Sequence, residues 1–372
     1  MPRKKQFRKF VVSTFLAKSF ETIVAYKPGE QLGDDYLKLN ANESSQEPSP
    51  RVLEVLKNVQ NLNYYNDPCQ HKLRQKLADL HSLDKTNIIV GTGADDVLDL
   101  IFRTFFERGD KLAFPKVTYP FYKGYADTYG YEALEVPLTK DLHVDLSDYE
   151  DLPHAVLVVN PDAPTGFLKP LSAIKKLVAS HPERLVIVDE AYIDFGGAPQ
   201  TAIKLVEEFS NVIVVRTFSK SRQLAGGRIG YAVACKELIK DMEDLKMAVN
   251  PFNVSLLQEE VAIASLEDEF HFERHVKEII ENRDYLTSAL RILGFKVLNS
   301  KTNFVYASSR LILGEELYEK LRERHILVRH YETEEVKDFV RITIGTKQEM
   351  HHLVSEVDAI LKEKDHVKSV NF

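Results

Sequence analysis

Lys220 is the side chain whose neighbours in the sequence most favour chemistry. It follows Val212–Val215, a run of apolar, β-branched residues that is typical of a buried strand. A lysine at the exit of a buried strand is partly desolvated, so its pKa falls and its neutral amine can condense with an aldehyde. For such a lysine taken alone, a solvated position at a strand end is the commoner situation.

Hydroxyl groups, glycines and an arginine surround this lysine in the sequence. Thr217 and Ser219 precede it, and Arg228 follows after a glycine-rich loop. Hydroxyl and guanidinium groups are suited to holding a phosphate. An amine together with these donors therefore predicts a site for an aldehyde cofactor that carries a phosphate, which is the chemistry of pyridoxal phosphate.

A second anion site is predicted in the loop that precedes the helix expected at Ala94–Arg108. The loop contains Gly91 and Gly93, and a helix that starts after a glycine turn offers free backbone N–H groups to an anion. We expect Gly93, Ala94 and Asp95 to present main-chain donors there. The alternative is an ordinary strand-to-helix turn in which the acidic residues favour the helix dipole.

Polar and aromatic residues follow three further predicted strands. Asp189 ends a buried strand, where an unpaired carboxylate is costly, so a protonated pyridine nitrogen is a suitable partner. Tyr192 follows and could bind the phenolic oxygen of that ring, while Tyr119 offers an aromatic face. Asn160 and Asp162 are expected to point polar groups into the site. The alternatives are core packing for Tyr119, and backbone N–H groups or an arginine as partners of Asp189.

Two arginines and two histidines remain to be interpreted. Arg329 and Arg341 lie on predicted strands near the C-terminus and could grip an anionic substrate, although a surface salt bridge is the commoner role for each. His271 and His275 have the spacing of helical metal ligands. Because no third ligand is evident, we expect no metal site.

The elements that must position these residues alternate between strands and helices. Strands are predicted at 87–90, 111–114, 155–159, 185–188, 212–215 and 229–234, with helices at 94–108, 171–180 and 201–209 between them. Such alternation predicts an α/β fold with a mostly parallel sheet covered on both faces, whose ligands gather at the carboxyl ends of the strands. After about residue 265, a long charged helix (267–293) and short strands indicate a smaller α+β domain.

Composition excludes several classes of function. The 372 residues carry a formal net charge of −7, which argues against a surface for nucleic acid. Only two cysteines occur, so neither a disulfide framework nor a cysteine-based zinc site is expected. The apolar stretch near the N-terminus is interrupted by polar residues and lacks a small-residue cleavage site. We therefore expect a basic arm rather than a signal peptide, no membrane, and a cytoplasmic protein.

Taken together, these motifs resemble the histidinol-phosphate aminotransferases, class II members of the fold-type-I enzymes that use pyridoxal phosphate. The resemblance runs from about residue 26 to the C-terminus. It rests on the segments LNANESS (39–45), YNDP (65–68), GTGADD (91–96), TYPFY (118–122), NPDAPTG (160–166), VDEAY (188–192), TFSKSRQLAGGRIGY (217–231), KTNFVY (301–306) and VRITIGT (340–346). It implies a large domain (46–265) with a mostly parallel seven-stranded sheet, a small C-terminal domain (266–372), and an N-terminal arm (1–45) that partly joins the small domain.

The resemblance also implies roles for individual residues. Lys220 would bond to the cofactor and carry protons, Asp189 would hold the pyridine nitrogen, and Tyr192 the phenolic oxygen. The remaining cofactor contacts would come from Gly93, Ala94, Asp95, Tyr119, Asn160, Asp162, Thr217, Ser219 and Arg228, with Tyr65 supplied by the second subunit of a homodimer. The substrate would be bound by Tyr26, Asn42, Asn303, Arg329 and Arg341.

One position departs from the family pattern. The loop of the family usually has an Asn that binds the phenolic oxygen where this chain has Ala163, so Tyr192 would hold that oxygen with less help. The reaction implied is amino transfer between L-histidinol phosphate and 2-oxoglutarate. The alternatives are an aromatic amino-acid aminotransferase, a phosphothreonine-type decarboxylase and a non-catalytic binding or regulatory protein.

Overall fold

The computed structural model describes residues 13–21, 23–196 and 200–370 of the chain. Most of the basic N-terminal arm that the sequence analysis singled out lies in residues 1–12, outside the described residues.

The described residues form a large seven-stranded sheet, as the resemblance implied. Its strands, in their order across the sheet, are β2 (Ile88–Gly91), β8 (Gly230–Ala234), β7 (Val212–Thr217), β6 (Val186–Asp189), β5 (Ala155–Val159), β3 (Lys111–Pro115) and β4 (Glu132–Val136). Strand β8 pairs antiparallel with β2 and β7, while the other pairings are parallel. The carboxyl ends of β5, β6 and β7 therefore lie along one edge.

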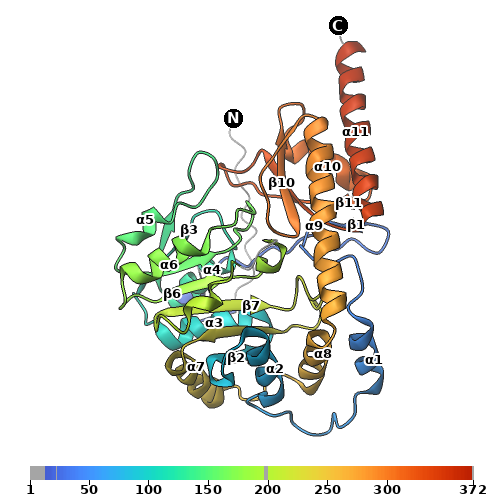
Figure 1. The fold of residues 1–372 in the computed structure, drawn as a ribbon. Helices are drawn as coiled ribbons and strands as arrows, with labels where there is room; N and C mark the ends of the chain where they lie inside the picture. Colours follow the sequence, from blue (N-terminus) through green and yellow to red (C-terminus); the bar gives the residue numbers. More distant parts are fainter. Residues whose placement is uncertain (1–12, 22, 197–199, 371–372) are drawn as a thin grey trace.

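Helices cover both faces of this sheet (Figure 1). One face packs against α2 (His71–His81), α6 (Leu171–Ser180) and α8 (Leu256–Leu266), and the other against α3 (Gly93–Phe105), α4 (Phe121–Tyr129) and α7 (Lys236–Val249). Neighbouring residues of each strand bury their side chains on opposite faces. Val212 and Val214 of β7 face the first group of helices, whereas Ile213 and Val215 face the second. Burial on both faces explains why these strands are continuous apolar runs.

A smaller unit is built on a second sheet of the described residues. This sheet is antiparallel and contains, in spatial order, β12 (Arg329–His330), β13 (Phe339–Thr343), β10 (Phe304–Ser309) and β9 (Phe295–Val297). It is covered by α9 (Glu269–Ile292), α10 (Gly314–Glu323) and α11 (Lys347–Val370). A separate parallel pair joins β1 (Leu37–Lys38) to β11 (Ile326–Leu327), so an N-terminal segment is part of the C-terminal unit.

Helix α9 connects the two units. It contacts α8, the 3-10 turn η3 (Ile193–Gly196), β9, β10 and α11. Figure 1 shows α9 extending from α8 to the side of β10 and α11. The other short elements are α1 (Pro50–Asn58), α5 (Ser147–Glu150), η1 (Lys18–Phe20), η2 (Lys85–Asn87) and η4 (Ala202–Leu205). Among the described helices, none has both the length and the apolar character needed to cross a bilayer.

The structure corrects two of the predicted elements. Where a helix was predicted over 201–209, the structure has only the short 3-10 turn η4, and Glu190 contacts its start. The hydroxyl of Thr201 and the backbone N–H of Ala202 both donate to its carboxylate at 2.6 Å. The edge strand β4 was missed, since its polar and half-exposed residues lack the apolar run of a central strand. The predicted domain limits stay a prediction.

Candidate active site

A cavity of about 320 Å³ lies at the carboxyl ends of the parallel strands. The last residues of three neighbouring strands line it, namely Val159 of β5, Asp189 of β6 and Thr217 of β7. The other lining residues are Ala41, Glu43, Ala94, Asp95, Leu98, Tyr119, Tyr122, Ala163, Ala191, Tyr192, Ser219, Lys220, Ala225, Gly226 and Arg228. Lys220 and Asp189 therefore share one cavity, as the sequence analysis required.

Lys220 has the electrostatic environment of a reactive amine. Burial, together with the positive charge of Arg341, lowers its pKa to about 8, although the charges of Glu43 and Asp95 oppose this shift. Its Nζ atom lies 5.7 Å from the centre of the Tyr192 ring. A large fraction of this lysine is therefore neutral near pH 8, which is the form that attacks a carbonyl carbon.

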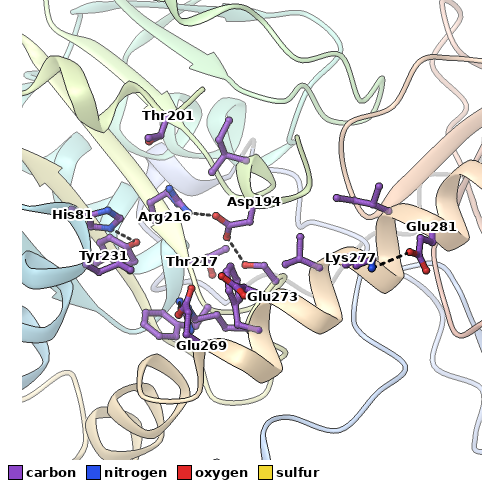
Figure 2. A pocket seen from close by; sticks show the side chains of 18 residues that line it. His81, Asp194, Thr201, Arg216, Thr217, Tyr231, Glu269, Glu273, Lys277 and Glu281 are labelled. Carbon is purple, nitrogen blue, oxygen red and sulfur yellow. Dashed lines mark hydrogen bonds and ion pairs between the residues drawn. The ribbon is translucent and has the colours of Figure 1, made fainter. Parts of the chain in front are cut away.

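A buried polar network supports the lysine loop from the opposite side of β7. Asp194 forms an ion pair with Arg216 and accepts a hydrogen bond from Ser221, the residue that follows Lys220. These groups line a second cavity of about 750 Å³ between α2, η3 and α9, and Figure 2 shows Arg216 pointing at Asp194 within it. The charges of Arg216 and Asp194 neutralise each other at the centre of this cavity, and the bond from Ser221 to Asp194 holds the loop that carries Lys220. The larger cavity is therefore the weaker candidate for the active site.

Asp189 is buried, but its carboxylate is held in place. Oδ2 accepts a hydrogen bond of 2.6 Å from the hydroxyl of Tyr122, and Oδ1 accepts one of 3.0 Å from the backbone N–H of Ala191. Burial raises the pKa of the carboxyl group. Among the described residues no arginine or lysine forms an ion pair with it, so a cationic ring nitrogen in the cavity would have a partner. The sequence analysis missed Tyr122, although the TYPFY segment contains it.

Donors for an anion gather where α3 begins. The first N–H groups of this helix, at Ala94 and Asp95, have no acceptor within the helix, and both residues line the cavity. Arg228 lies beside them, with Nη1 at 3.4 Å from the hydroxyl of Ser219 and Nη2 at 3.3 Å from Asp95. Thr217 donates to Ser219 at 3.0 Å and orients it. A phosphate-sized anion fits this group of donors.

Tyr119 forms one wall of the cavity. Its hydroxyl donates to Asp95 at 3.0 Å, and its ring stacks on that of Phe121 with 5.0 Å between ring centres. Burial, followed by the charge of Asp95, raises the pKa of the hydroxyl well above its usual range. Packing in the core and offering a face to the cofactor ring are therefore compatible roles for Tyr119, because it packs on Phe121 and also lines the cavity.

Asn160 and Asp162 do not lie where the sequence analysis placed them. Asn160 is buried and accepts a hydrogen bond of 2.8 Å from the backbone N–H of Lys169. Asp162 is buried in an ion pair with the side chain of the same lysine. Neither residue lines the cavity, whereas Ala163 does. The polar side chains of Asn160 and Asp162 thus bond to Lys169. Ala163 presents its methyl group to the cavity.

Arg341 does not line the cavity, but its positive charge acts on Lys220 within it. Its guanidinium lies over the rings of Phe304 and Tyr331, at 5.4 and 5.7 Å from their centres. One terminal nitrogen donates to the backbone carbonyl of Asn40 at 3.0 Å. Its Nε atom is buried without a hydrogen-bond partner among the described residues. A buried donor without an acceptor is costly, so a bound anion would satisfy it.

Tyr26 and Arg329 lie on the same side as Arg341. Arg329 is more exposed and donates to the backbone carbonyls of Lys27 and Pro28. Burial raises the pKa of the Tyr26 hydroxyl, and the charges of both arginines oppose this shift. Tyr26 therefore shares an electrostatic environment with Arg329 and Arg341, and the contact of the three with substrate stays a prediction.

Asn42 and Asn303 use their amides within the protein. Asn303 donates to the backbone carbonyl of Asn42 at 3.1 Å, and Asn42 donates to the hydroxyl of Tyr192 at 2.9 Å. Both are buried, and neither lines the cavity. These contacts shape the site, while the Oδ1 atom of Asn303 has no hydrogen-bond partner among the described residues, and the expected contact of both residues with substrate stays a prediction.

Tyr65 lies apart from the cavity of its own subunit. Its side chain is 83% exposed and stacks on Phe252, with 4.5 Å between ring centres. Large apolar side chains nearby in the sequence, Leu62 and Tyr64, are exposed as well. Several large apolar side chains are therefore exposed to solvent around Tyr65.

Metal binding has little support among the described residues. His271 and His275, the pair with helical spacing, instead bond to the side chains of Gln223 and Gln46. The ligand atoms of Asp67, Cys69 and His71 lie within 4.8 Å of one another. Asp67, however, accepts from the backbone N–H groups of Cys69 and His71, so it organises the start of α2.

These features fit the cofactor that the sequence analysis expected. The cavity contains an amine of lowered pKa, a buried carboxylate without a cationic partner, an aromatic wall and a group of anion donors. These are the four contacts that pyridoxal phosphate requires from a protein.

Comparison with known proteins gives the family. Residues 34–357 match the model of the class I and II aminotransferases. A histidinol-phosphate aminotransferase of Brachyspira hyodysenteriae is 38% identical over 94% of this chain and 100% of its own length. Another, from Rhizobium meliloti, is 42% identical over 93% of this chain and 100% of its own length.

Solved structures agree with this assignment. The histidinol-phosphate aminotransferase of Sinorhizobium meliloti, in complex with pyridoxal-5'-phosphate, is 25% identical and superposes with a TM-score of 0.83. The comparison covers 95% of this chain and 99% of that one. With a family model over most of its length and full-length relatives of about two fifths identity, the chain belongs to the class I and II aminotransferases.

Proposed function

We propose that this aminotransferase uses pyridoxal phosphate to transfer an amino group from L-histidinol phosphate to 2-oxoglutarate, giving imidazole-acetol phosphate and L-glutamate. The observation that carries the proposal is the placement of Lys220 and Asp189 in one cavity, together with the full-length similarity to histidinol-phosphate aminotransferases. In the cell this is a step of histidine biosynthesis, and we propose that it takes place in the cytoplasm.

When bound, pyridoxal phosphate supplies an aldehyde that bonds to amines and a ring that accepts electrons from the substrate. Lys220, with its pKa of about 8, can take a proton from the substrate carbon and return it, as a general base and acid. The carboxylate of Asp189 holds the proton on the ring nitrogen. Tyr119 packs on the ring, and Tyr192 donates to the phenolic oxygen.

Arg228, Ser219 and the backbone N–H groups of Ala94 and Asp95 bind the phosphate of the cofactor in this proposal. Gly93 allows Arg228 to approach the start of α3 closely. The substrate places its own anionic group near Arg341, with Tyr26 and Arg329 at the outer side. Two separate anion sites suit a reaction in which cofactor and substrate each carry a phosphate.

We also propose that the active enzyme is a homodimer. In that arrangement Tyr65 extends from one subunit into the phosphate site of the other. Its high exposure and its distance from the cavity of its own subunit support this role. The proposed dimer therefore contains two sites, each completed by a residue of the partner subunit.

The test is a panel of amino donors on the purified protein, each assayed with 2-oxoglutarate. We expect turnover of histidinol phosphate to exceed that of phenylalanine by at least about 100-fold, since phenylalanine lacks the phosphate that Arg341 would bind. Preference for phenylalanine would indicate an aromatic aminotransferase instead. Release of carbon dioxide from phosphothreonine without an oxo acid would indicate a decarboxylase.

A matched pair of variants tests the site itself. Lys220→Ala should lose turnover and the absorbance of the lysine-bound cofactor. Lys204→Ala, on the turn η4 away from the cavity, should keep both. Full activity of the Lys220 variant would contradict the proposal.

A further inference from the structure

Asn42 lies at the end of an N-terminal segment that is fixed to the small unit. The carbonyl of Leu39 accepts a hydrogen bond of 3.0 Å from the backbone N–H of Thr343. The backbone N–H of Asn42 donates to the hydroxyl oxygen of Thr343 at 3.0 Å, and its carbonyl accepts from Asn303 at 3.1 Å. The backbone of Asn42 is thus held at both its donor and its acceptor.

These contacts determine which way the Asn42 amide points. Because the Thr343 hydroxyl accepts from the backbone of Asn42, its own proton is available for another acceptor. The Oδ1 atom of Asn42 lies 3.3 Å away and takes that proton. The Nδ2 group is therefore turned toward Tyr192, whose hydroxyl oxygen lies 2.9 Å from it.

The bond from Asn42 leaves the hydroxyl proton of Tyr192 free for a ligand. The Tyr192 oxygen acts as acceptor in this bond, and among the described residues no acceptor for its own proton is present. Tyr192 lines the cavity beside Lys220 and Asp189. The direction of the free proton is therefore set from outside the cavity by an amide that does not line it.

Several charged and polar groups near Tyr192 affect the pKa of its hydroxyl. Burial raises the pKa of its hydroxyl, and the charge of Arg341 and the hydrogen bond from Asn42 both oppose that shift. Asp189 and Tyr331 raise the pKa. Lys220 lies over the ring. Of these groups, Asn42 is the one that donates directly to the hydroxyl oxygen.

We propose that Asn42 is a positioning residue, which orients the Tyr192 hydroxyl so that it donates to the phenolic oxygen of the cofactor. The inference rests on the proposed function, since it assigns a role toward pyridoxal phosphate. Through the hydrogen bonds of Asn42 and Tyr192, the N-terminal segment and Thr343 of the small unit would then affect the apparent pKa of the bound cofactor.

The absorbance of the lysine-bound cofactor, titrated with pH, measures this effect independently of turnover. A donor to the phenolic oxygen stabilises its anionic form, so losing the donor raises the apparent pKa of the bound cofactor. Tyr192→Phe should raise it by about one unit. Asn42→Gly suits the positive φ of 54° at this position and should raise the apparent pKa by about half a unit.

The double variant decides whether Asn42 acts through Tyr192. Asn42→Gly combined with Tyr192→Phe should titrate like Tyr192→Phe alone. A shift from Asn42→Gly that persists in full without the tyrosine hydroxyl would overturn the proposal, as would a titration of Asn42→Gly identical to that of the wild type. If Asn42→Gly does not fold, Asn42→Asp retains the size and the contact with Thr343, and it should shift the titration in the same direction.

Asn40→Ala is the matched control. Asn40 belongs to the same segment and is buried, but its amide donates to the carbonyl of Glu30, far from Tyr192 in the hydrogen-bond network. This variant should titrate like the wild type. A wild-type protein that shows no cofactor absorbance would refute the proposed function, whereas normal wild-type absorbance with an unaffected Asn42 variant would refute only this inference.

Discussion

The guanidinium of Arg228 occupies the space that a β-carbon at Gly93 would need. A β-carbon built there would lie only 2.9 Å from Cζ of Arg228 and closer still to Nη2, and the backbone of Gly93 has a φ of +85°. Gly93→Ala would therefore strain the backbone and displace Arg228 from Ser219. We expect the affinity for pyridoxal phosphate to fall by about tenfold, in line with the loss of one charge-assisted hydrogen bond. Titration of the apoenzyme with the cofactor measures this change.

Gly124→Ala serves as the control for that variant. Gly124 lies inside α4, and a β-carbon there would meet nothing within 4 Å. Alanine is the better helix former by about 1 kcal/mol, so the variant should be as stable as the wild type or more so. Equal losses of cofactor affinity in both variants would argue against the role given to Arg228.

Loading of the cofactor onto the apoenzyme should depend on pH through Lys220. The neutral amine reacts, and its fraction rises with pH through the lowered pKa of about 8, so the loading rate should rise with a midpoint there. Arg341→Gln removes a charge that lowers this pKa. The midpoint should then move to higher pH by about half a unit, and loading at pH 7 should slow. Stopped-flow absorbance gives both profiles, and an unchanged midpoint would separate Arg341 from Lys220.

The buried pair of Lys169 and Asp162 should contribute to stability rather than to catalysis. Lys169→Met leaves the carboxylate buried without its partner, at a cost of about 3–5 kcal/mol in the free energy of unfolding. Adding Asp162→Asn to that variant should recover part of the loss. Urea denaturation measures both, and a double variant less stable than the single one would contradict this explanation.

Mixing two inactive variants tests the role of Tyr65 in the proposed homodimer. The Lys220→Ala subunit keeps Tyr65 but lacks the reactive amine. The Tyr65→Ala subunit keeps the amine but lacks the tyrosine. In a mixed dimer one of the two sites has both residues, so random exchange of subunits should restore about a quarter of the wild-type sites. Activity no greater than that of the separate variants, under conditions where exchange is shown to occur, would place Tyr65 outside the partner's site.

The central strands and the lysine site were predictable because their sequence signals are local. Strand β5 and helix α6 form over the predicted ranges, and burial on both faces of the sheet produced the apolar runs that marked the strands. Lys220 was identified by its place after such a run. The order of strands along the sheet brought it to the same cavity as Asp189, as expected of carboxyl ends of parallel strands.

Other contacts were not predicted because the local sequence does not reveal which partner a polar side chain has. The amide of Asn42 is turned by Thr343, about 300 positions later, which no local pattern reveals. Asp162 bonds to Lys169 nearby, yet nothing in the loop sequence distinguishes a carboxylate paired in the interior from one that faces a ligand. The segment after Thr201 has helical periodicity, yet it forms only the short 3-10 turn η4, whose start donates to the carboxylate of Glu190.

The pairing of β1 with β11 has a consequence for synthesis of the protein on the ribosome. Residues 37–42 are translated hundreds of codons before their partners at 326–327 and Thr343. During that interval β1 has no strand to pair with, and the Asn42 side chain lacks the Thr343 hydroxyl that turns it toward Tyr192. The nascent chain can thus make the whole large sheet, whose last strand ends at Ala234, before the partner strand of β1 and the hydroxyl that orients Asn42 are translated.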